Sequence, residues 1–166
     1  MESSFSEYDF EDSVERIDEI LDSDDADYQD SDTPPSRDEL TFTNGFYVNC
    51  SALFVDMRGS SQLSAKHKNP TLAKIYRSYI SELVALFRGN VQVNEISIEG
   101  DCVWGIYDTP KKRDIDRVFS TAYCASSLID ILNYKYRQKG ISEINVGIGI
   151  AYGRALMIKP DTKTVE

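Results

Sequence analysis

The stretch at residues 53–60, LFVDMRGS, decides the fold together with its counterpart at residues 96–104, ISIEGDCVW. Each stretch is an apolar run that ends in an aspartate beside a tight glycine turn, with Asp56 in the first and Asp101 in the second. A carboxylate at the end of a buried strand costs free energy unless a partner compensates its charge. Two such aspartates on neighbouring strands can hold divalent metal against a phosphate chain. The pair therefore predicts a metal site.

The apolar pattern around these stretches predicts alternating strands and helices. The expected elements are a strand over 46–55, a short helix over 60–66, a helix from Asn69-Pro70 to Gly89-Asn90, a hairpin over 91–107 that turns at 100–101, a helix over 115–137, and strands over 143–151 and 155–158 with a turn between them. This order is the split βαβ arrangement of a ferredoxin-like α+β sandwich, in which the first strand and the returning hairpin strand are neighbours. Asp56 then lies beside the turn that carries Asp101.

Charge divides the chain into a tail and a domain. Residues 1–40 hold 16 acidic and 2 basic side chains, whereas the other 126 residues hold 12 acidic and 16 basic ones. We expect residues 1–40 to be an acidic, mostly disordered tail, in which residues 14–21 have helical spacing and could form a short helix or docking motif. We expect residues 43–166 to be the working domain. Its slight basic excess suits a nucleotide but is too small for duplex nucleic acid.

Cysteine usage and hydropathy point to a soluble cytoplasmic protein. The three cysteines lie in apolar contexts without metal-ligand spacing, as expected of reduced thiols. No apolar run approaches the roughly 18–20 residues that span a bilayer, and the acidic N-terminus has no signal-peptide character. We therefore expect no membrane partner.

Each aspartate motif has a structural alternative when taken alone. Residues 57–61 lead from a strand into a helix, so their free amides could receive phosphate oxygens, with Arg58 adding charge. Alternatively, Ser60 could cap that helix, with Asp56 as a capping residue. Gly-Asp is also a common hairpin turn. Two carboxylates at adjacent strand ends with a phosphate-type loop between them favour two-metal phosphoryl or nucleotidyl transfer.

The two motifs resemble those of a known family. FVDMRGS at 54–60 and IEGDCVWG at 98–105 are similar to the metal-aspartate motifs of class III nucleotidyl cyclases, which include the adenylate and guanylate cyclases. The strings DMRGSS and EGDCVWG are most similar to those of the pyrimidine cyclases of bacterial Pycsar antiphage defence. The resemblance covers about residues 43–160.

Carried over to this sequence, the resemblance implies a two-metal lyase. Asp56 and Asp101 would be the catalytic residues and would ligate two Mn²⁺ or Mg²⁺ ions per active site, with the Met57 carbonyl as a further ligand. The implied triphosphate-binding residues are Met57, Arg58, Gly59 and Ser60. The ribose 3′-oxygen would attack the α-phosphate and release pyrophosphate, without a protein nucleophile.

Two departures from the family pattern matter. Purine cyclases have Lys or Glu three residues before the glycine of the Gly-Asp turn, where this chain has Ser97. A short hydroxyl does not reach a purine edge as lysine does, which favours a pyrimidine and leaves Tyr47 as another candidate for base recognition. The chain also stops before a C-terminal strand-helix segment that supplies ribose and transition-state contacts in the family, so we expect the domain to be incomplete.

The leading hypothesis is a homodimeric pyrimidine nucleotide cyclase that makes cyclic UMP or cyclic CMP, with UTP favoured over CTP. The resemblance implies that the product is a second messenger for a separate effector in an abortive antiphage response. The alternatives are a purine cyclase and a catalytically degenerate cyclase-like module that binds nucleotide or dimerises.

Overall fold

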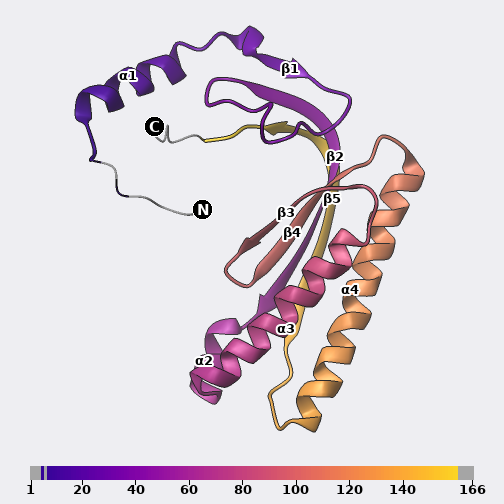
Figure 1. Ribbon diagram of the computed structural model, residues 1–166. Coiled ribbons are helices and arrows are strands. Elements are labelled where there is room, and N and C mark those ends of the chain that lie inside the picture. The colour runs from indigo at the N-terminus through magenta and orange to yellow at the C-terminus, as the bar shows by residue number, and fades with distance from the viewer. Residues whose placement is uncertain (1–4, 6, 161–166) are drawn as a thin grey trace. The chain divides into compact units, whose positions relative to one another are not determined.

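The computed structural model describes residue 5 and residues 7–160 (Figure 1). It divides into two units, residues 49–153 and residues 1–48 with 154–166, and each is considered by itself. Residues 161–166 of the predicted domain lie outside the described residues. Among the described residues, no helix has both the length and the apolar character needed to cross a bilayer.

The larger unit is built on the predicted sheet. Its strands are β2 (Gly45–Arg58), β3 (Val93–Glu99), β4 (Cys102–Asp108) and β5 (Asn145–Met157). Their order is β5-β2-β4-β3, and β4 pairs antiparallel with both β2 and β3. This is the strand order of a split βαβ sheet, which confirms the ferredoxin-like prediction.

Two long helices cover one face of this sheet (Figure 1). A short 3₁₀ helix, η2 (Ser60–Gln62), and α2 (Leu63–Lys66) follow β2, and the long helices are α3 (Asn69–Arg88) and α4 (Lys112–Gln138). The helix predicted from Asn69-Pro70 is α3, and it is buried at every fourth position, at Ile75, Tyr79, Leu83 and Phe87. Residues four apart share one helix face, so these four side chains enter the core together.

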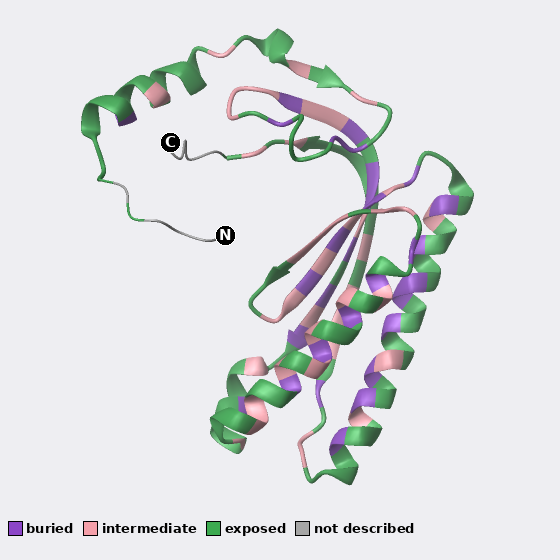
Figure 2. Ribbon diagram, in the orientation of Figure 1, coloured by how far each residue is buried: buried purple, intermediate pink, exposed green. Residues whose placement is uncertain are grey.

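The core lies between the helices and the sheet, as the buried residues in Figure 2 show. β2 contributes alternate residues to it, Leu53, Val55 and Met57, and β4 contributes Val103 and Tyr107. Alternation of this kind sends the side chains between them to the opposite face of the sheet. Asp56 therefore lies on the face that the helices leave open.

Three local predictions need correction. α3 is capped by Lys68 without a side-chain hydrogen bond, one residue before the predicted Asn69. α4 extends beyond the predicted 115–137 at both ends. The predicted turn at 152–154 is absent, because Gly153 does not adopt a positive φ and β5 continues straight through it.

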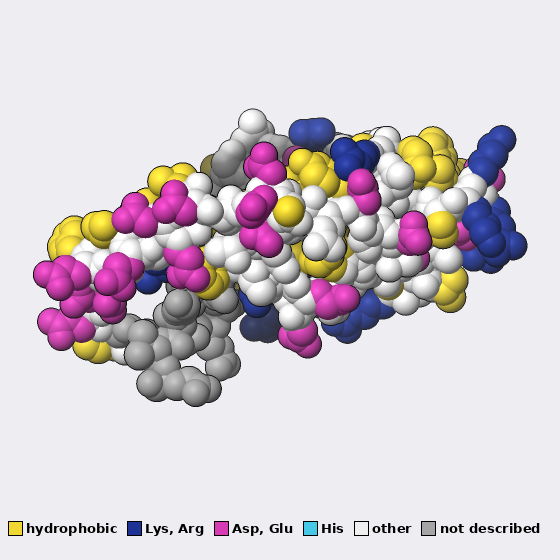
Figure 3. Space-filling model, turned by 90° about the horizontal axis from the view of Figure 1, so that it is seen from above, with side chains coloured by type: hydrophobic (Ala, Val, Ile, Leu, Met, Phe, Trp, Pro, Cys, Tyr) yellow, Lys and Arg dark blue, Asp and Glu magenta, His cyan; other side chains and the backbone are white. Residues whose placement is uncertain are grey.

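The smaller unit contains more regular structure than the acidic composition predicts. Its elements are α1 (Phe10–Leu21), the 3₁₀ helix η1 (Asp25–Asp27) and β1 (Tyr28–Asp30), which pairs parallel with the start of β2. The Asp9 carboxylate caps α1 by accepting from the amides of Glu11 and Asp12. The candidate helix at 14–21 is thus part of α1, whose acidic and apolar side chains are visible at the left of Figure 3. The tail-and-domain division stays a prediction.

Candidate metal and nucleotide site

The two aspartates lie at adjacent strand ends of the larger unit. Asp56 is two residues from the end of β2 and pairs in register with Cys102, the first residue of β4. Asp101 directly precedes Cys102 in the hairpin turn, where Gly100 has a φ of 63°. Neighbouring strands lie about 4.8 Å apart, so the register brings the two motifs together.

The charges of both aspartates act on the same two neighbours. The pKa of the Cys102 thiol is raised by burial and further by the carboxylates of Asp56, Glu99 and Asp101. The pKa of the Tyr79 phenol is also raised, chiefly by burial and then by Cys102, Asp56 and Asp101. A negative potential of this kind disfavours further anions and favours a cation. The site is therefore an acidic concentration in a domain whose net charge is positive.

Tyr79 of α3 supports the site from inside the core. Its side chain is fully buried, and its hydroxyl donates to the carbonyl oxygen of Val55 at 3.1 Å. This bond fixes the β2 backbone immediately before Asp56. A tyrosine on a helical apolar stripe gives no sequence signal for such a bond, because its acceptor is 24 residues away.

Arg58 forms an ion pair with Asp56 at the site. Its Nη1 lies 3.2 Å from Asp56 Oδ2, with 64% of the Arg58 side chain and 39% of the Asp56 side chain exposed. An ion pair this exposed contributes at most about 1 kcal/mol, so a divalent cation can replace it. The Arg58 guanidinium lies against Gly147 of β5, where a Cβ atom would overlap it. Gly147 was missed by the sequence analysis, and it provides the space for this arginine.

The loop after β2 is not the helix cap that was considered as an alternative. Gly59 is the N-cap residue of η2, with a φ of 65°, and no side chain caps this helix. Ser60 is its first residue rather than its cap, and the described ion pair of Asp56 is with Arg58. The left-handed glycine turns the chain sharply beside the aspartate.

The open face of the sheet carries an aromatic pair next to the aspartates. Phe54 and Trp104 are paired in register, and their rings stack with centroids 5.8 Å apart. Ser97 pairs with Trp104 from β3 and so shares this face. The Trp104 indole donates to Glu99 at 3.3 Å. Ser97, one of the two candidates for base recognition, thus belongs to the same surface as Asp56.

Tyr47, the other candidate, belongs to the smaller unit. It lies nine positions before Asp56 in β2, and the guanidinium of Arg154 is 3.9 Å from its ring centroid. Arg154 also forms an ion pair with Asp30 at 2.7 Å. Within its own unit the Tyr47 ring therefore already stacks against a cation. Its role with a base stays a prediction.

The residues at the strand ends fit a hard divalent cation. Two carboxylates and one backbone carbonyl are oxygen donors, which Mg²⁺ and Mn²⁺ prefer. The Met57 side chain is buried in the core, so only its carbonyl is available as a ligand. Among the described residues, no group of three or more His, Cys, Asp or Glu side chains is placed to hold a metal. Waters and substrate phosphates would complete such a site, as is common for Mg²⁺.

Comparison with known families assigns the chain. Residues 43–159 match the family described as the adenylate and guanylate cyclase catalytic domain. The chain belongs to this family. The match confirms the resemblance to class III nucleotidyl cyclases and covers both aspartate motifs and the whole larger unit. Enzymes of this kind depend on divalent metal, which agrees with the oxygen donors of the cyclase domain.

Two sequence relatives of this cyclase domain are uridylate cyclases. The one from Gulbenkiania mobilis is 42% identical over an alignment that covers 96% of this chain and 64% of that protein. The one from Treponema porcinum is 35% identical over 94% of this chain and 54% of that protein. Both names agree with the resemblance to pyrimidine cyclases. The chain spans less than two thirds of the length of either relative.

A solved cyclase has the same fold. The guanylyl cyclase Cya2 aligns with a TM-score of 0.64 over 72% of this chain and 61% of its own chain, at 17% sequence identity. At this identity the likeness shows the fold alone. It confirms that the split βαβ sheet with two covering helices is that of a class III cyclase catalytic domain.

Proposed function

We propose that the protein is a divalent-metal-dependent pyrimidine nucleotide cyclase that converts UTP, or CTP, to the 3′,5′-cyclic monophosphate and pyrophosphate. The observation that carries this proposal is the pairing of Asp56 with Cys102, which brings both aspartate motifs to one end of the sheet. Membership of the cyclase family and two relatives named uridylate cyclase support it.

The proposed reaction forms the bond between the ribose 3′-oxygen and the α-phosphorus and breaks the bond from that phosphorus to pyrophosphate. The 3′-hydroxyl loses its proton to solvent as its oxygen attacks. Two metal ions, when bound, would lower the pKa of that hydroxyl and stabilise the charge on pyrophosphate. Asp56, Asp101 and the Met57 carbonyl would hold them.

The loop residues would hold the triphosphate. The amides of Arg58, Gly59 and Ser60 lie at the turn between β2 and η2, where no side chain caps the helix. Backbone amides at such a turn can receive the β- and γ-phosphate oxygens. The Arg58 guanidinium would exchange Asp56 for a phosphate oxygen, since its present ion pair is exposed and weak.

Base selection would rest on Ser97, with Tyr47 as a second candidate. Ser97 pairs with Trp104, whose ring stacks on Phe54, so a serine hydroxyl borders an aromatic surface. A hydroxyl both donates and accepts, which matches the mixed edge of a pyrimidine. Both relatives are named uridylate cyclase, so we favour UTP over CTP.

We further propose that the enzyme is a homodimer and that its product is the second messenger of an antiphage response. The exposed aromatic surface on the open sheet face favours a partner subunit, since Phe54 is 40% exposed. The defence role rests on the resemblance to Pycsar cyclases. Loss of phage protection in cells carrying Asp56→Ala, with protection retained in Asp130→Asn, is the expected outcome of a plaque assay.

Product identification tests the proposed activity directly. Purified full-length protein with Mn²⁺ and each of the four nucleoside triphosphates is expected to yield cyclic UMP or cyclic CMP and an equal amount of pyrophosphate, measured by chromatography and mass spectrometry. Asp130→Asn, an exposed acid on α4, is the matched control for Asp56→Asn and Asp101→Asn. A cyclic purine product, or no product from an intact full-length protein, would refute the pyrimidine cyclase proposal.

A further inference from the structure

A second candidate site lies at the other end of β3, between the end of α3 and the first half of α4. It is a groove of about 450 Å³. Its lining includes Leu86, Asn90, Val91, Arg117, Thr121 and Cys124. β3 begins beside this groove at Val93 and ends at Glu99, next to the aspartate turn. A strand of that length spans about 20 Å, so the groove is distinct from the metal site.

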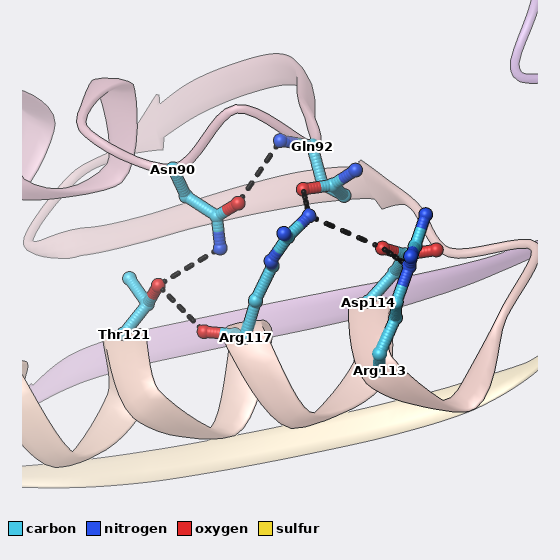
Figure 4. Close-up of polar contacts among 6 residues, drawn as sticks. All are labelled: Asn90, Gln92, Arg113, Asp114, Arg117 and Thr121. Atoms are coloured by element: carbon cyan, nitrogen blue, oxygen red, sulfur yellow. Dashed lines mark hydrogen bonds and ion pairs between the residues drawn. The ribbon is translucent and has the colours of Figure 1, made fainter.

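The floor of the groove is a closed hydrogen-bond network (Figure 4). Asn90 Nδ2 donates to Thr121 Oγ1 at 2.9 Å, and Asn90 Oδ1 accepts from the Gln92 amide at 2.9 Å. Thr121 Oγ1 in turn donates to the Arg117 carbonyl at 3.1 Å. The loop after α3 is thereby fixed against α4. Because the side chains of Asn90 and Thr121 already have these hydrogen-bond partners, Arg117 is the main polar group left to bind a ligand.

Arg117 is the charged group of this groove, and it is held in place. Its Nη1 donates to Gln92 Oε1 at 3.0 Å and to Asp114 Oδ1 at 3.3 Å (Figure 4). The Asp114 carboxylate is only 4% exposed, and Arg113 also lies 3.7 Å from it. Two guanidiniums therefore lie against one buried carboxylate, and the Asp108 carboxylate is close enough to Asp114 to interact with it. The Arg117 side chain is 51% exposed, and the contacts of its guanidinium described here use Nη1, so Nε and Nη2 face no described competitor.

We propose that this groove binds a small organic anion that has one phosphate or carboxylate group and a compact apolar or planar body. The pre-oriented guanidinium would receive the anionic group through Nε and Nη2, which is the bidentate geometry that arginine provides. The body would lie against Leu86 and Val91, the latter 83% exposed. A volume of this size suits a ligand such as a nucleoside monophosphate.

Cys124 gives the experiment a readout inside the groove. It is an exposed thiol on the lining, whereas Cys102 is partly buried at the aspartate end of the sheet. The alkylation rate of each thiol by N-ethylmaleimide is measured by peptide mass spectrometry on full-length protein in EDTA, without turnover. We expect UMP to slow Cys124 alkylation about tenfold at a concentration about ten times Kd, with Cys102 unaffected. Uridine and inorganic phosphate are tested separately and should each protect far less.

Two variants test the proposed contacts. Arg117→Gln removes the guanidinium, and Val91→Glu places a carboxylate at an exposed position that lines the groove, where it cannot disturb the core. Both should abolish the protection by UMP, and Lys135→Gln, near the other end of α4, should retain it. Absent protection by UMP, equal protection by uridine or by phosphate, or protection retained in Val91→Glu would overturn the proposal. None of these results depends on cyclase activity.

Discussion

The carboxylates at the two ends of the sheet in the larger unit differ in burial and in the number of arginines around them. At the groove end, Asp114 is 4% exposed and lies between Arg113 and Arg117. At the metal end, Asp56 is 39% exposed and its ion pair among the described residues is with the exposed Arg58, while Glu99 and Asp101 add negative charge around Cys102. Asp114 is buried and has two arginine partners, whereas Asp56 is partly exposed and its described ion pair is with one arginine.

This difference separates structural acids from acids available for chemistry. Breaking a buried ion pair by removing one partner is costly, so Asp114 contributes to folding and to the orientation of Arg117. A group of partly exposed carboxylates with one weak counter-ion is stabilised when a cation binds. Substitution at each end should therefore change a different property of the protein.

The largest expected effect is on catalysis at the metal end. Asp56→Asn or Asp101→Asn should lower kcat by at least about 1,000-fold, because each removes a charged metal ligand. The melting temperature should stay the same or rise slightly, because each substitution removes one of several neighbouring negative charges that repel one another. Steady-state kinetics and calorimetry on the same preparations measure both. If the loss of activity is accompanied by a large fall in melting temperature, these aspartates are needed for the fold and not for catalysis alone.

At the groove end, Asp114→Ala should lower the free energy of unfolding by about 3 kcal/mol, because it leaves two guanidiniums without their buried partner. The folded fraction should keep its kcat. Urea denaturation followed by circular dichroism gives the stability, and Asp116→Ala two residues later on α4 is the control. A change below about 0.5 kcal/mol would show that Asp114 is not a structural acid.

Gly147 should affect substrate binding. A methyl group at Gly147 would displace the Arg58 guanidinium, so Gly147→Ala should raise the KM for the triphosphate about tenfold with a smaller change in kcat. Gly149→Ala in the same strand is the matched control, since a Cβ there meets nothing within 4 Å. Equal KM values in the two variants would show that Arg58 does not contribute to triphosphate binding.

The smallest effect is a pH dependence at Asp108. Burial and the nearby Asp114 raise the pKa of this carboxyl, and its Oδ1 has no hydrogen-bond partner among the described residues. A raised folded-state pKa contributes stability that is present below the unfolded-state pKa and is lost as pH rises through the folded-state value. Asp108→Asn should therefore raise the melting temperature at pH 7 by on the order of 2 °C and by less at pH 3. The same increase at both pH values would show that the ionised Asp108 carboxylate is not the cause of the lost stability.

Local signals in the sequence were sufficient to predict most of the larger unit. The four-residue spacing from Ile75 to Phe87 predicts α3, and Gly100-Asp101 between alternating strands predicts the hairpin. Strand order then follows from the βαβ rules, so the juxtaposition of Asp56 and Asp101 was predictable.

The features that were missed depend on partners distant in sequence or on backbone angles. The Tyr79 bond to Val55, the Arg58 guanidinium over Gly147, and the Ser142 amide that donates to His67 at 3.1 Å join residues 24 to 89 positions apart. Gly153 permits a turn but does not require one, so the pattern predicted a break where β5 is continuous. Composition likewise predicted disorder for a tail in which α1 has a capping aspartate and one apolar stripe.

Metal binding tests the central claim, that Asp56 and Asp101 form one cation site, most directly. Mn²⁺ binding to the full-length protein is titrated by electron paramagnetic resonance in the presence of a non-cyclisable UTP analogue. We predict saturable binding at about two ions per active site that is weakened at least about 100-fold by either Asp56→Asn or Asp101→Asn and retained in Asp130→Asn. Unchanged Mn²⁺ affinity in either aspartate variant would contradict the account.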